Sequence, residues 1–295
     1  MRMDDERESR NVDDRRQSSG RGGGGAPSMQ MMMMLWPIVK PLLKSKFGIL
    51  IIGAGVAAYF MGYNPLSLVG MGGTSSAPVD KVKDEQQAVF MKKVLGSTED
   101  IWKDILVKHG IRYKDAVMVL YRGSTRSGCG GAQSQMGPFY CPSDKKVYLD
   151  LSFFDELASR HNSPGDFAQA YVLAHEIGHH VQDLQGTLDK VQRAKQSWGG
   201  NSSKSNALQV KVELQADCYS GVWAHHAQER FNVLEPGDIE EALRAASAIG
   251  DDTLQKEAGQ RVRPDGFTHG SSQQRVSWFR RGFESGDLGQ CDTFQ

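Results

Sequence analysis

One short motif constrains this chain more than any other feature. The letters HEIGH occupy residues 175–179, inside a segment, residues 163–181, whose apolar side chains recur at helical spacing. Two histidines four positions apart lie on the same side of a helix, so the imidazoles of His175 and His179 can reach one metal ion. Glu176 then lies beside the ion without binding it. The motif therefore predicts a buried helix with two metal ligands and a general base.

A third ligand is expected on another helix, predicted over residues 206–230. The letters ELQAD place Glu213 and Asp217 one helical turn apart. Glu213 can complete a three-ligand zinc site that keeps its fourth position for water, and Asp217 can orient a ligand histidine. The alternative is that Glu213 is an exposed helix charge and Asp217 an unrelated neighbour.

Other histidines have less specific interpretations. His180 lies about 100° around the helix from His179, which favours a packing or surface role. His225 and His226 fall near the end of the second predicted helix, where a solvated pair is expected rather than a set of ligands.

Long stretches of this sequence resemble the bacterial neutral zinc metallopeptidase family of the YpfJ type. The resemblance covers nearly all of the chain from residue 47 onward and is carried by GCGGAQSQMGPFYCPSDKKVYLDLSFFDEL, AHEIGHHVQ, ELQADCYSGVW and FTHGSSQQRVSWFRRG. It implies a zincin fold with a single membrane anchor. It also implies zinc bound by His175, His179 and Glu213, with Glu176 as catalytic base. Membership implies a peptide or protein substrate without specifying which one.

A more distant similarity links the late Thr-His-Gly stretch and Arg275 to gluzincins of the CAAX-prenyl-protease and HtpX types. By that analogy His269 hydrogen-bonds the developing oxyanion and Arg275 orders the site. A capping or core role for His269 is the alternative, because two serines typical of a helix start follow directly.

An uncharged apolar run, residues 47–63, is long enough to cross a bilayer as a helix. Lysines precede it closely and none follows until Lys81, so the positive-inside rule places the N-terminus in the cytoplasm. We therefore expect a disordered cytoplasmic tail and interfacial segment (1–46), a membrane anchor (47–63), a flexible linker (64–80) and an exported domain (81–295). The domain would lie in the periplasm or outside the cell.

Four cysteines fit an exported domain, where thiols oxidise. Their proximity in sequence favours a disulfide between Cys129 and Cys141. Cys218 and Cys291 are the remaining pair, although Cys218 could instead be a buried free thiol. A cytoplasmic domain would require all four to be reduced.

The remaining pattern predicts an α+β fold, mostly helical, with a small sheet. Strands are expected at 116–121 and 146–152, and helices at 83–95, 97–109, 238–256 and 271–284. The chain carries 35 acidic and 35 basic residues, so its net charge gives no attraction to nucleic acid.

Three functions remain open at this stage. The first is a zinc metalloendopeptidase that is anchored in membrane lipid by one helix. The second is a catalytically silent zinc-binding envelope protein that acts as a binding or assembly factor. The third is a structural envelope protein that binds no metal. The sequence does not specify an oligomeric state.

Overall fold

The computed structural model describes residues 1–17, 80–133, 137–160, 165–200 and 202–295. Residues 1–17 and Val82–Gln295 belong to one compact unit. Among these described residues, no helix is both long and apolar enough to span a bilayer. The predicted anchor, residues 47–63, lies outside them, as do residues 18–46 of the predicted tail and 64–79 of the predicted linker.

A small mixed sheet forms one layer of the fold. Its strand order is β1 (Val12–Asp14), β2 (Val117–Tyr121), β6 (Lys146–Asp150) and β5 (Phe139–Cys141). β2 pairs in parallel with β1 and β6, whereas β5 pairs antiparallel with β6 and forms an edge. A separate hairpin joins β3 (Ser124–Ser127) to β4 (Gly130–Gln133).

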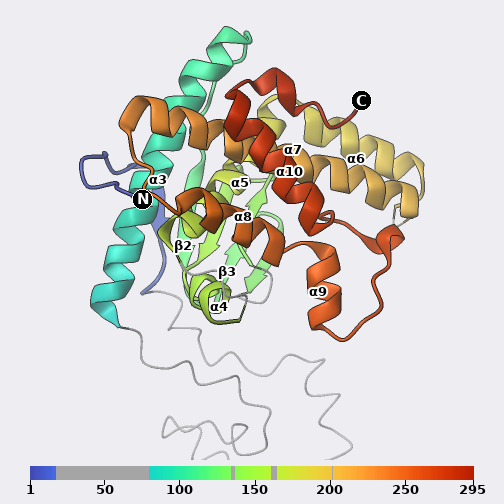
Figure 1. Ribbon diagram of the computed structural model, residues 1–295, viewed down its shortest axis with the longest axis horizontal. Coiled ribbons are helices and arrows are strands. Elements are labelled where there is room, and N and C mark those ends of the chain that lie inside the picture. The colour runs from blue at the N-terminus through green and yellow to red at the C-terminus, as the bar shows by residue number, and fades with distance from the viewer. Residues whose placement is uncertain (18–79, 134–136, 161–164, 201) are drawn as a thin grey trace, which may run out of the picture. The chain divides into compact units, whose positions relative to one another are not determined.

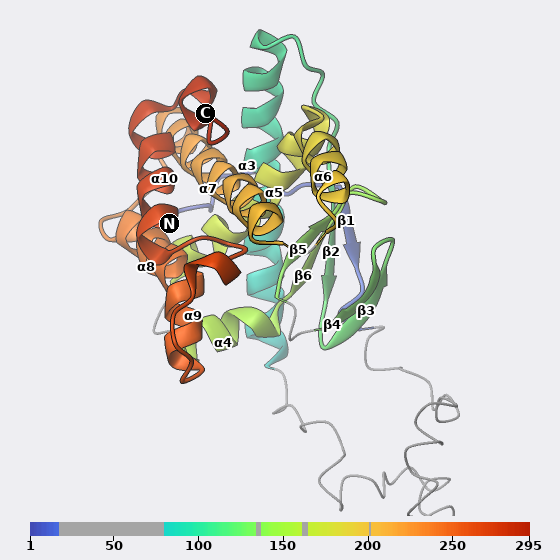
Figure 2. The same ribbon diagram turned by 90° about the vertical axis from the view of Figure 1, so that its right-hand side faces the viewer.

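Helices make up most of the described chain, which confirms the predicted α+β class. They are α3 (Lys81–Lys108), α4 (Ser152–Arg160), α5 (Asp166–Leu184), α6 (Thr187–Ser197), α7 (Ser203–Phe231), α8 (Asp238–Ala248), α9 (Asp251–Glu257) and α10 (Ser272–Ser285). Short 3-10 turns follow at Pro264–Gly266 and Leu288–Cys291. α5 contacts β5 and β6 as well as α7 and α8, so it lies between the sheet and the other helices (Figure 2).

The N-terminal segment packs against this unit. β1 extends the sheet beside β2, and the side chains of Met1 and Met3 are buried in the main core. Arg7 forms ion pairs with Glu99 and Asp100 of α3 at 2.8 and 2.7 Å. The prediction of a disordered tail is therefore wrong for residues 1–17. Arg7 and Arg16 form ion pairs with acidic residues of α3, and composition alone does not predict such long-range pairs.

α7 and α10 lie side by side and approach each other very closely (Figure 1). A Cβ added at Gly282 would overlap the carbonyl oxygen of Cys218, and one at Gly221 would overlap that of Phe279. These two glycines allow the helix backbones to touch. The arrangement fixes α10 against the helix that carries Glu213 and Asp217.

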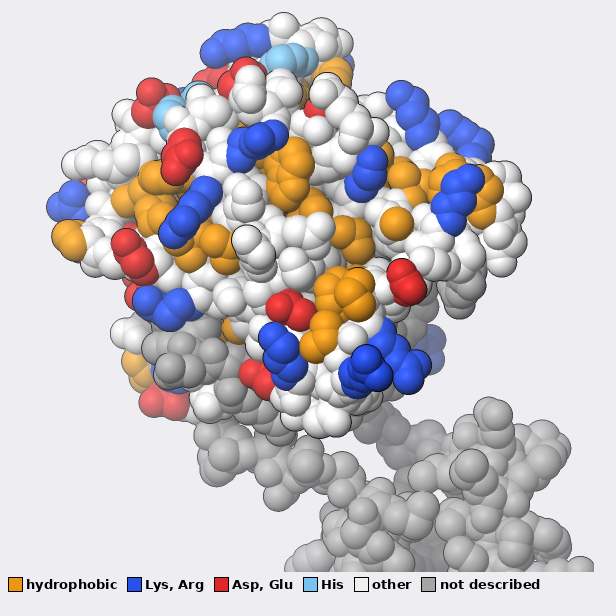
Figure 3. All heavy atoms as spheres, turned by 45° about the vertical axis from the view of Figure 1, so that its right-hand side comes forward, with side chains coloured by type: hydrophobic (Ala, Val, Ile, Leu, Met, Phe, Trp, Pro, Cys, Tyr) orange, Lys and Arg blue, Asp and Glu red, His pale blue; other side chains and the backbone are white. Residues whose placement is uncertain are grey.

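The face drawn in Figure 3 carries both basic and acidic side chains and is not dominated by either. Lysine and arginine side chains are mixed there with aspartate and glutamate, and apolar side chains lie between them. A mixed surface of this kind does not steer a polyanion toward that face.

Candidate metal centre

Three ligand atoms converge at the predicted centre. Nε2 of His175 lies 3.3 Å from Oε2 of Glu213, and Nε2 of His179 lies 3.4 Å from the same oxygen. A tetrahedral zinc ion with bonds of about 2.1 Å has its ligands about 3.4 Å apart. The donor set, two imidazoles and one carboxylate, is also one that zinc prefers. These residues therefore fit a zinc ion.

Outer contacts orient each of the three ligands. Nδ1 of His175 is 2.9 Å from Asp217, and Nδ1 of His179 is 2.9 Å from the side-chain oxygen of Gln182. Both histidines thus turn Nε2 toward the centre. Gln209 donates a 2.9 Å hydrogen bond to Oε1 of Glu213, which leaves Oε2 for the metal. Such contacts select the histidine tautomer and hold the ligands in place.

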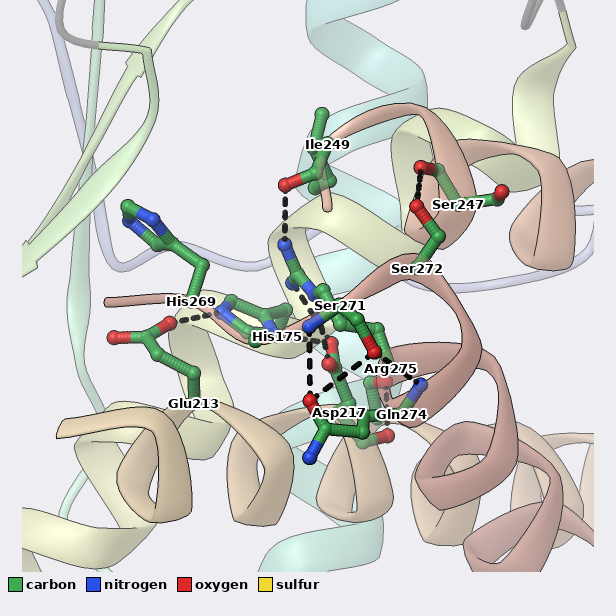
Figure 4. A network of polar contacts seen from close by, with 12 residues as sticks. His175, Glu213, Asp217, Ser247, Ile249, His269, Ser271, Ser272, Gln274 and Arg275 are labelled. Carbon is green, nitrogen blue, oxygen red and sulfur yellow. Dashed lines mark hydrogen bonds and ion pairs between the residues drawn. The ribbon is translucent and has the colours of Figure 1, made fainter. Parts of the chain in front are cut away.

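A buried ion pair supports Asp217 from the other side (Figure 4). Arg275 donates to both carboxylate oxygens of Asp217, at 2.8 and 2.9 Å, and also reaches the carbonyl oxygen of Ile249. The hydroxyl of Tyr171 donates to Asp217 at 2.6 Å. Asp217 is completely buried and Arg275 nearly so. The pair fixes the carboxylate that orients His175.

α5 and α7 must approach closely for the ligands to meet. Gly178 makes this possible, because a Cβ at that position would lie 3.1 Å from the backbone of Ala216. Gly178 lies in the first motif and Ala216 in the second. Each motif therefore contains a small residue that allows close helix packing, in addition to its proposed metal ligands.

Neighbouring positive groups keep both carboxylates at the centre ionised. Burial raises the pKa of Asp217, but Arg275 and His175 outweigh it and lower that pKa to about 2. Burial likewise opposes ionisation of Glu213, yet His179 and His175 hold its pKa well below the usual range. Both carboxylates are therefore ionised at neutral pH. Burial lowers the pKa of His175, but Asp217 and Glu213 raise it to about 10, so metal binding must displace a proton there.

The three ligand residues and Glu176 line one cavity of about 630 Å³. Its wall includes apolar side chains from several elements: Phe139, Phe153, Val172, Leu188, Val191, Val212 and Ile249. Glu176 is buried within this wall, with 7% of its surface exposed. The cavity has the size and mixed lining of a ligand-binding cleft.

His269 lies on the same cavity, as the sequence analysis expected for a site residue. Its Nδ1 is 3.1 Å from Oδ1 of Asp251, and its backbone N–H donates to the other oxygen of that carboxylate. The following serine, Ser271, caps α10 through a capping box with Gln274. The capping role therefore belongs to Ser271, and His269 is one of the residues that line the cavity. Figure 4 shows it beside Glu213 and His175.

Comparison with known proteins identifies the family. A family described as "Putative neutral zinc metallopeptidase" matches residues 1–294. This chain belongs to that family. It is 45% identical over 302 residues to an uncharacterized protein, YpfJ, of Escherichia coli K12, covering 100% of this chain and 99% of that one. It is also 45% identical over 208 residues to an uncharacterized protein of Mycobacterium tuberculosis H37Rv, covering 67% of each. No solved structure matches this family member.

His180 does not join the metal ligands of this family member. It is buried between Tyr113 and Tyr140, its Nδ1 lies 3.1 Å from the Tyr140 hydroxyl, and its Nε2 lies 2.6 Å from the carbonyl oxygen of Lys114. Burial lowers its pKa. His180 thus joins α5 to the segment before β2.

Both cysteine pairs form disulfides in the structure, Cys129 with Cys141 and Cys218 with Cys291. The first joins the tip of the β3–β4 hairpin to β5, whose neighbouring residues line the cavity. The second links α7, directly after Asp217, to the C-terminal 3-10 turn.

Three contributors to the site carry no recognisable motif. Tyr171, Gln182 and Gln209 contact Asp217, His179 and Glu213 respectively. Tyr171 and Gln209 each lie four residues before a ligand on the same helix, and Gln182 lies three after one. Helical spacing could have suggested them, but glutamine and tyrosine are common on helices and the spacing alone would select many residues.

Proposed function

We propose that this chain hydrolyses peptide bonds at the centre formed by His175, His179 and Glu213, with zinc as the resident ion. The proposal depends chiefly on one observation: three oriented ligand atoms and the Glu176 carboxylate meet in one cavity. Bound zinc would supply a water of lowered pKa and polarise the substrate carbonyl. The family description supports the same reaction class.

Glu176 is proposed as the general base. It is adjacent to His175 in the chain and lies in the same cavity without being part of the ligand cluster. A carboxylate in that position can take the proton of the attacking water and pass it to the leaving amine. The two roles need a side chain that is near the ligands but does not itself coordinate.

His269 is proposed to stabilise the oxyanion. Its hydrogen bond to Asp251 raises the pKa of the imidazole, which favours the protonated form of the ring. With Nδ1 held by Asp251, the Nε2–H can donate to an oxygen in the cavity. His269→Ala should lower kcat and leave zinc content unchanged; loss of zinc in that variant would assign His269 to metal binding instead.

An extended peptide is the proposed substrate. β5 is an edge strand, and Phe139 and Tyr140 of this strand line the cavity. An exposed strand edge can pair with the backbone of a bound peptide, while the apolar wall accepts a side chain. This supports a peptide or protein substrate and does not specify a sequence preference.

The test is a metal and activity assay on the purified full chain. Protein prepared without chelator should hold zinc and cleave members of a mixed peptide library. A chelator should abolish cleavage, and added zinc should restore it. Zinc without cleavage would favour a silent binding protein. Absence of metal would favour a structural protein and contradict the proposal.

We also propose that residues 1–17 and the metal-binding domain lie in one compartment, outside the cytoplasm. The two disulfides support an oxidising compartment. Because β1 and β2 are neighbours in one sheet, the N-terminal segment must lie on the same side of any membrane as the rest of that sheet. A cytoplasmic N-terminus combined with an exported domain is inconsistent with this pairing. A single crossing by residues 47–63 would place residues 1–17 and the domain on opposite sides of the membrane, so this proposal excludes residues 47–63 as a single-pass anchor.

A further inference from the structure

A second group of possible metal ligands lies near the C-terminal end of α7. His225, His226 and Glu229 each offer one ligand atom, and these atoms lie within 4.8 Å of one another. Nε2 of His225 is 3.5 Å from Oε1 of Glu229, and Nδ1 of His226 is 3.1 Å from Oε2. From sequence alone, we expected the two histidines to be a solvated pair.

Backbone contacts fix which ring nitrogen of each histidine carries a proton. Nδ1 of His225 lies 2.7 Å from the carbonyl oxygen of Phe283, and Nε2 of His226 lies 2.8 Å from that of Gly286. A carbonyl oxygen only accepts, so each of these nitrogens must donate. In a neutral ring the other nitrogen then presents a lone pair. In both histidines that lone pair faces the carboxylate of Glu229.

Each ring therefore presents a lone pair to an oxygen of the carboxylate, so hydrogen-bond acceptors face one another. This contact is unfavourable unless a positive charge lies between them. A bound cation would relieve this repulsion, because it can accept both lone pairs and the carboxylate oxygens. The first centre is similar in that Asp217 and Gln182 hold Nδ1 of His175 and His179, and both Nε2 atoms face a carboxylate. There the two nitrogens face one oxygen of Glu213, whereas here they face different oxygens of Glu229. The histidine–carboxylate distances agree closely, 3.3 and 3.4 Å there against 3.5 and 3.1 Å here.

Another cluster of possible ligands already has a positive partner within the protein. Asp166 and Asp238 also lie together as possible ligands, but the α-amino group of Met1 lies 3.0 and 3.2 Å from them and supplies the positive charge. Glu229 has no such lysine, arginine or amino-group partner among the described residues. Its ion-pair partners there are His225 and His226.

We propose that His225, His226 and Glu229 bind a second divalent metal ion of the zinc class. Two imidazoles favour zinc, copper or nickel over magnesium or calcium, which prefer oxygen ligands. The side chains are 27, 30 and 62% exposed, so water can complete the coordination. This site is separate from the catalytic cavity and does not depend on peptidase activity.

The bound ion would strengthen the contact between α7 and the end of α10. Phe283 lies in the last turn of α10 and Gly286 is its C-cap residue. A metal ion on the opposite nitrogen makes each imidazole N–H a stronger donor to those two carbonyl oxygens. Gly286 adopts a φ of 60°, and a Cβ there would lie 2.4 Å from the ring of His225. Only glycine therefore allows this close approach.

The first test uses the full chain, without a histidine tag, as a His175→Ala/His179→Ala double variant that removes the first centre. Zinc is titrated against a chromogenic chelator. We expect about one zinc per chain. Adding Glu229→Gln should weaken this binding by about 10-fold or more, since a charged ligand is lost. Glu240→Gln, on exposed α8 surface, is the matched control and should not change it.

The second test uses the otherwise unaltered protein, in case the double variant does not fold. Zinc content should be two per chain and should fall to one in His226→Ala. It should stay at two in His109→Ala, which removes an exposed histidine elsewhere. One zinc in the unaltered protein, unchanged by His226→Ala, would overturn the second site while leaving the first intact. No zinc at all would contradict both.

Discussion

Nδ1 of His175 lies 2.9 Å from Oδ1 of Asp217. That oxygen also accepts hydrogen bonds from Tyr171 at 2.6 Å and from Arg275 at 2.9 Å. The carboxylate cannot rotate without breaking several buried contacts. The orientation of His175, a proposed metal ligand, is thereby fixed by α10, a helix that supplies no proposed ligand itself.

Asp217→Ala should weaken zinc binding by about 10-fold or more, because His175 loses the group that holds its tautomer and direction. Competition with a fluorescent zinc chelator measures the affinity. His180→Ala is the control: it removes a buried imidazole of the same helix that contacts no ligand, so zinc affinity of the folded variant should remain. Equal losses in the two variants would mean that Asp217 acts only through stability.

Gly282→Ala should lower the free energy of unfolding by about 2 kcal/mol or more, because the new methyl group would overlap the α7 backbone at Cys218. Gly266→Ala is a suitable control, since a Cβ there meets nothing within 4 Å and the backbone needs no positive φ. Urea denaturation of both variants compares the two sites. A midpoint for Gly282→Ala equal to that of the control would contradict the close helix contact.

Both disulfides should be present in protein taken from cells. Non-reducing peptide mapping should find Cys129 linked to Cys141 and Cys218 linked to Cys291. On loop-entropy grounds, removing the first, with a separation of 12 residues, should cost roughly 3 kcal/mol, and removing the second, with 73, roughly 4 kcal/mol. Free thiols at all four positions would instead indicate a reducing compartment.

The shared sheet predicts one compartment for the N-terminal segment and the domain. Arg10→Cys and Gln260→Cys each place one thiol at an exposed position, one in the N-terminal segment and one in the domain. The native cysteines are paired and should not react. A membrane-impermeant maleimide applied to intact cells or spheroplasts should label both variants or neither. Labelling of only one would contradict the pairing of β1 with β2.

Helix periodicity predicted much of the fold, and its errors have identifiable causes. The two helices expected at 83–95 and 97–109 are one helix, α3. Gly96 suggested a break, but glycine is needed there because a Cβ would lie 2.6 Å from the carbonyl oxygen of Arg7. Ser97, at the start of the second predicted helix, lies inside α3 and accepts a hydrogen bond from Trp223. Both residues serve contacts with distant segments that a local pattern does not contain.

The opposite error occurs at 238–256, which was expected as one helix and forms α8 and α9. The chain turns at Gly250, where a Cβ would overlap Ser272 at the start of α10. The segment expected to be helical over residues 163–181 forms α5 from Asp166 with Gly165 as N-cap, and its first two residues lie outside the described ones. β1, β5 and the β3–β4 hairpin were not expected. These strands are short, and their pairing depends on distant partners.

The structure brings together the residues that the two motifs singled out, and their metal-binding and catalytic roles stay predictions. The motif residues His175, Glu176 and His179 follow from helical spacing, and Glu213 with Asp217 from the same rule on a second helix. The two helices bring these residues together only because Gly178 lets α5 pack closely against Ala216 of α7. The role of Arg275 in holding Asp217 depends on the packing of α10, which no local pattern encodes.

The central claim is that the chain is a zinc peptidase with Glu176 as general base. Measuring peptide hydrolysis and zinc content of the Glu176→Gln variant tests it most directly. The substitution keeps the size of the side chain and all three proposed ligands, but removes the base. Zinc content should match that of the unaltered protein, and kcat for peptide cleavage should fall by about 100-fold or more. A variant that retains zinc and cleaves peptides at the original rate would contradict the proposed mechanism.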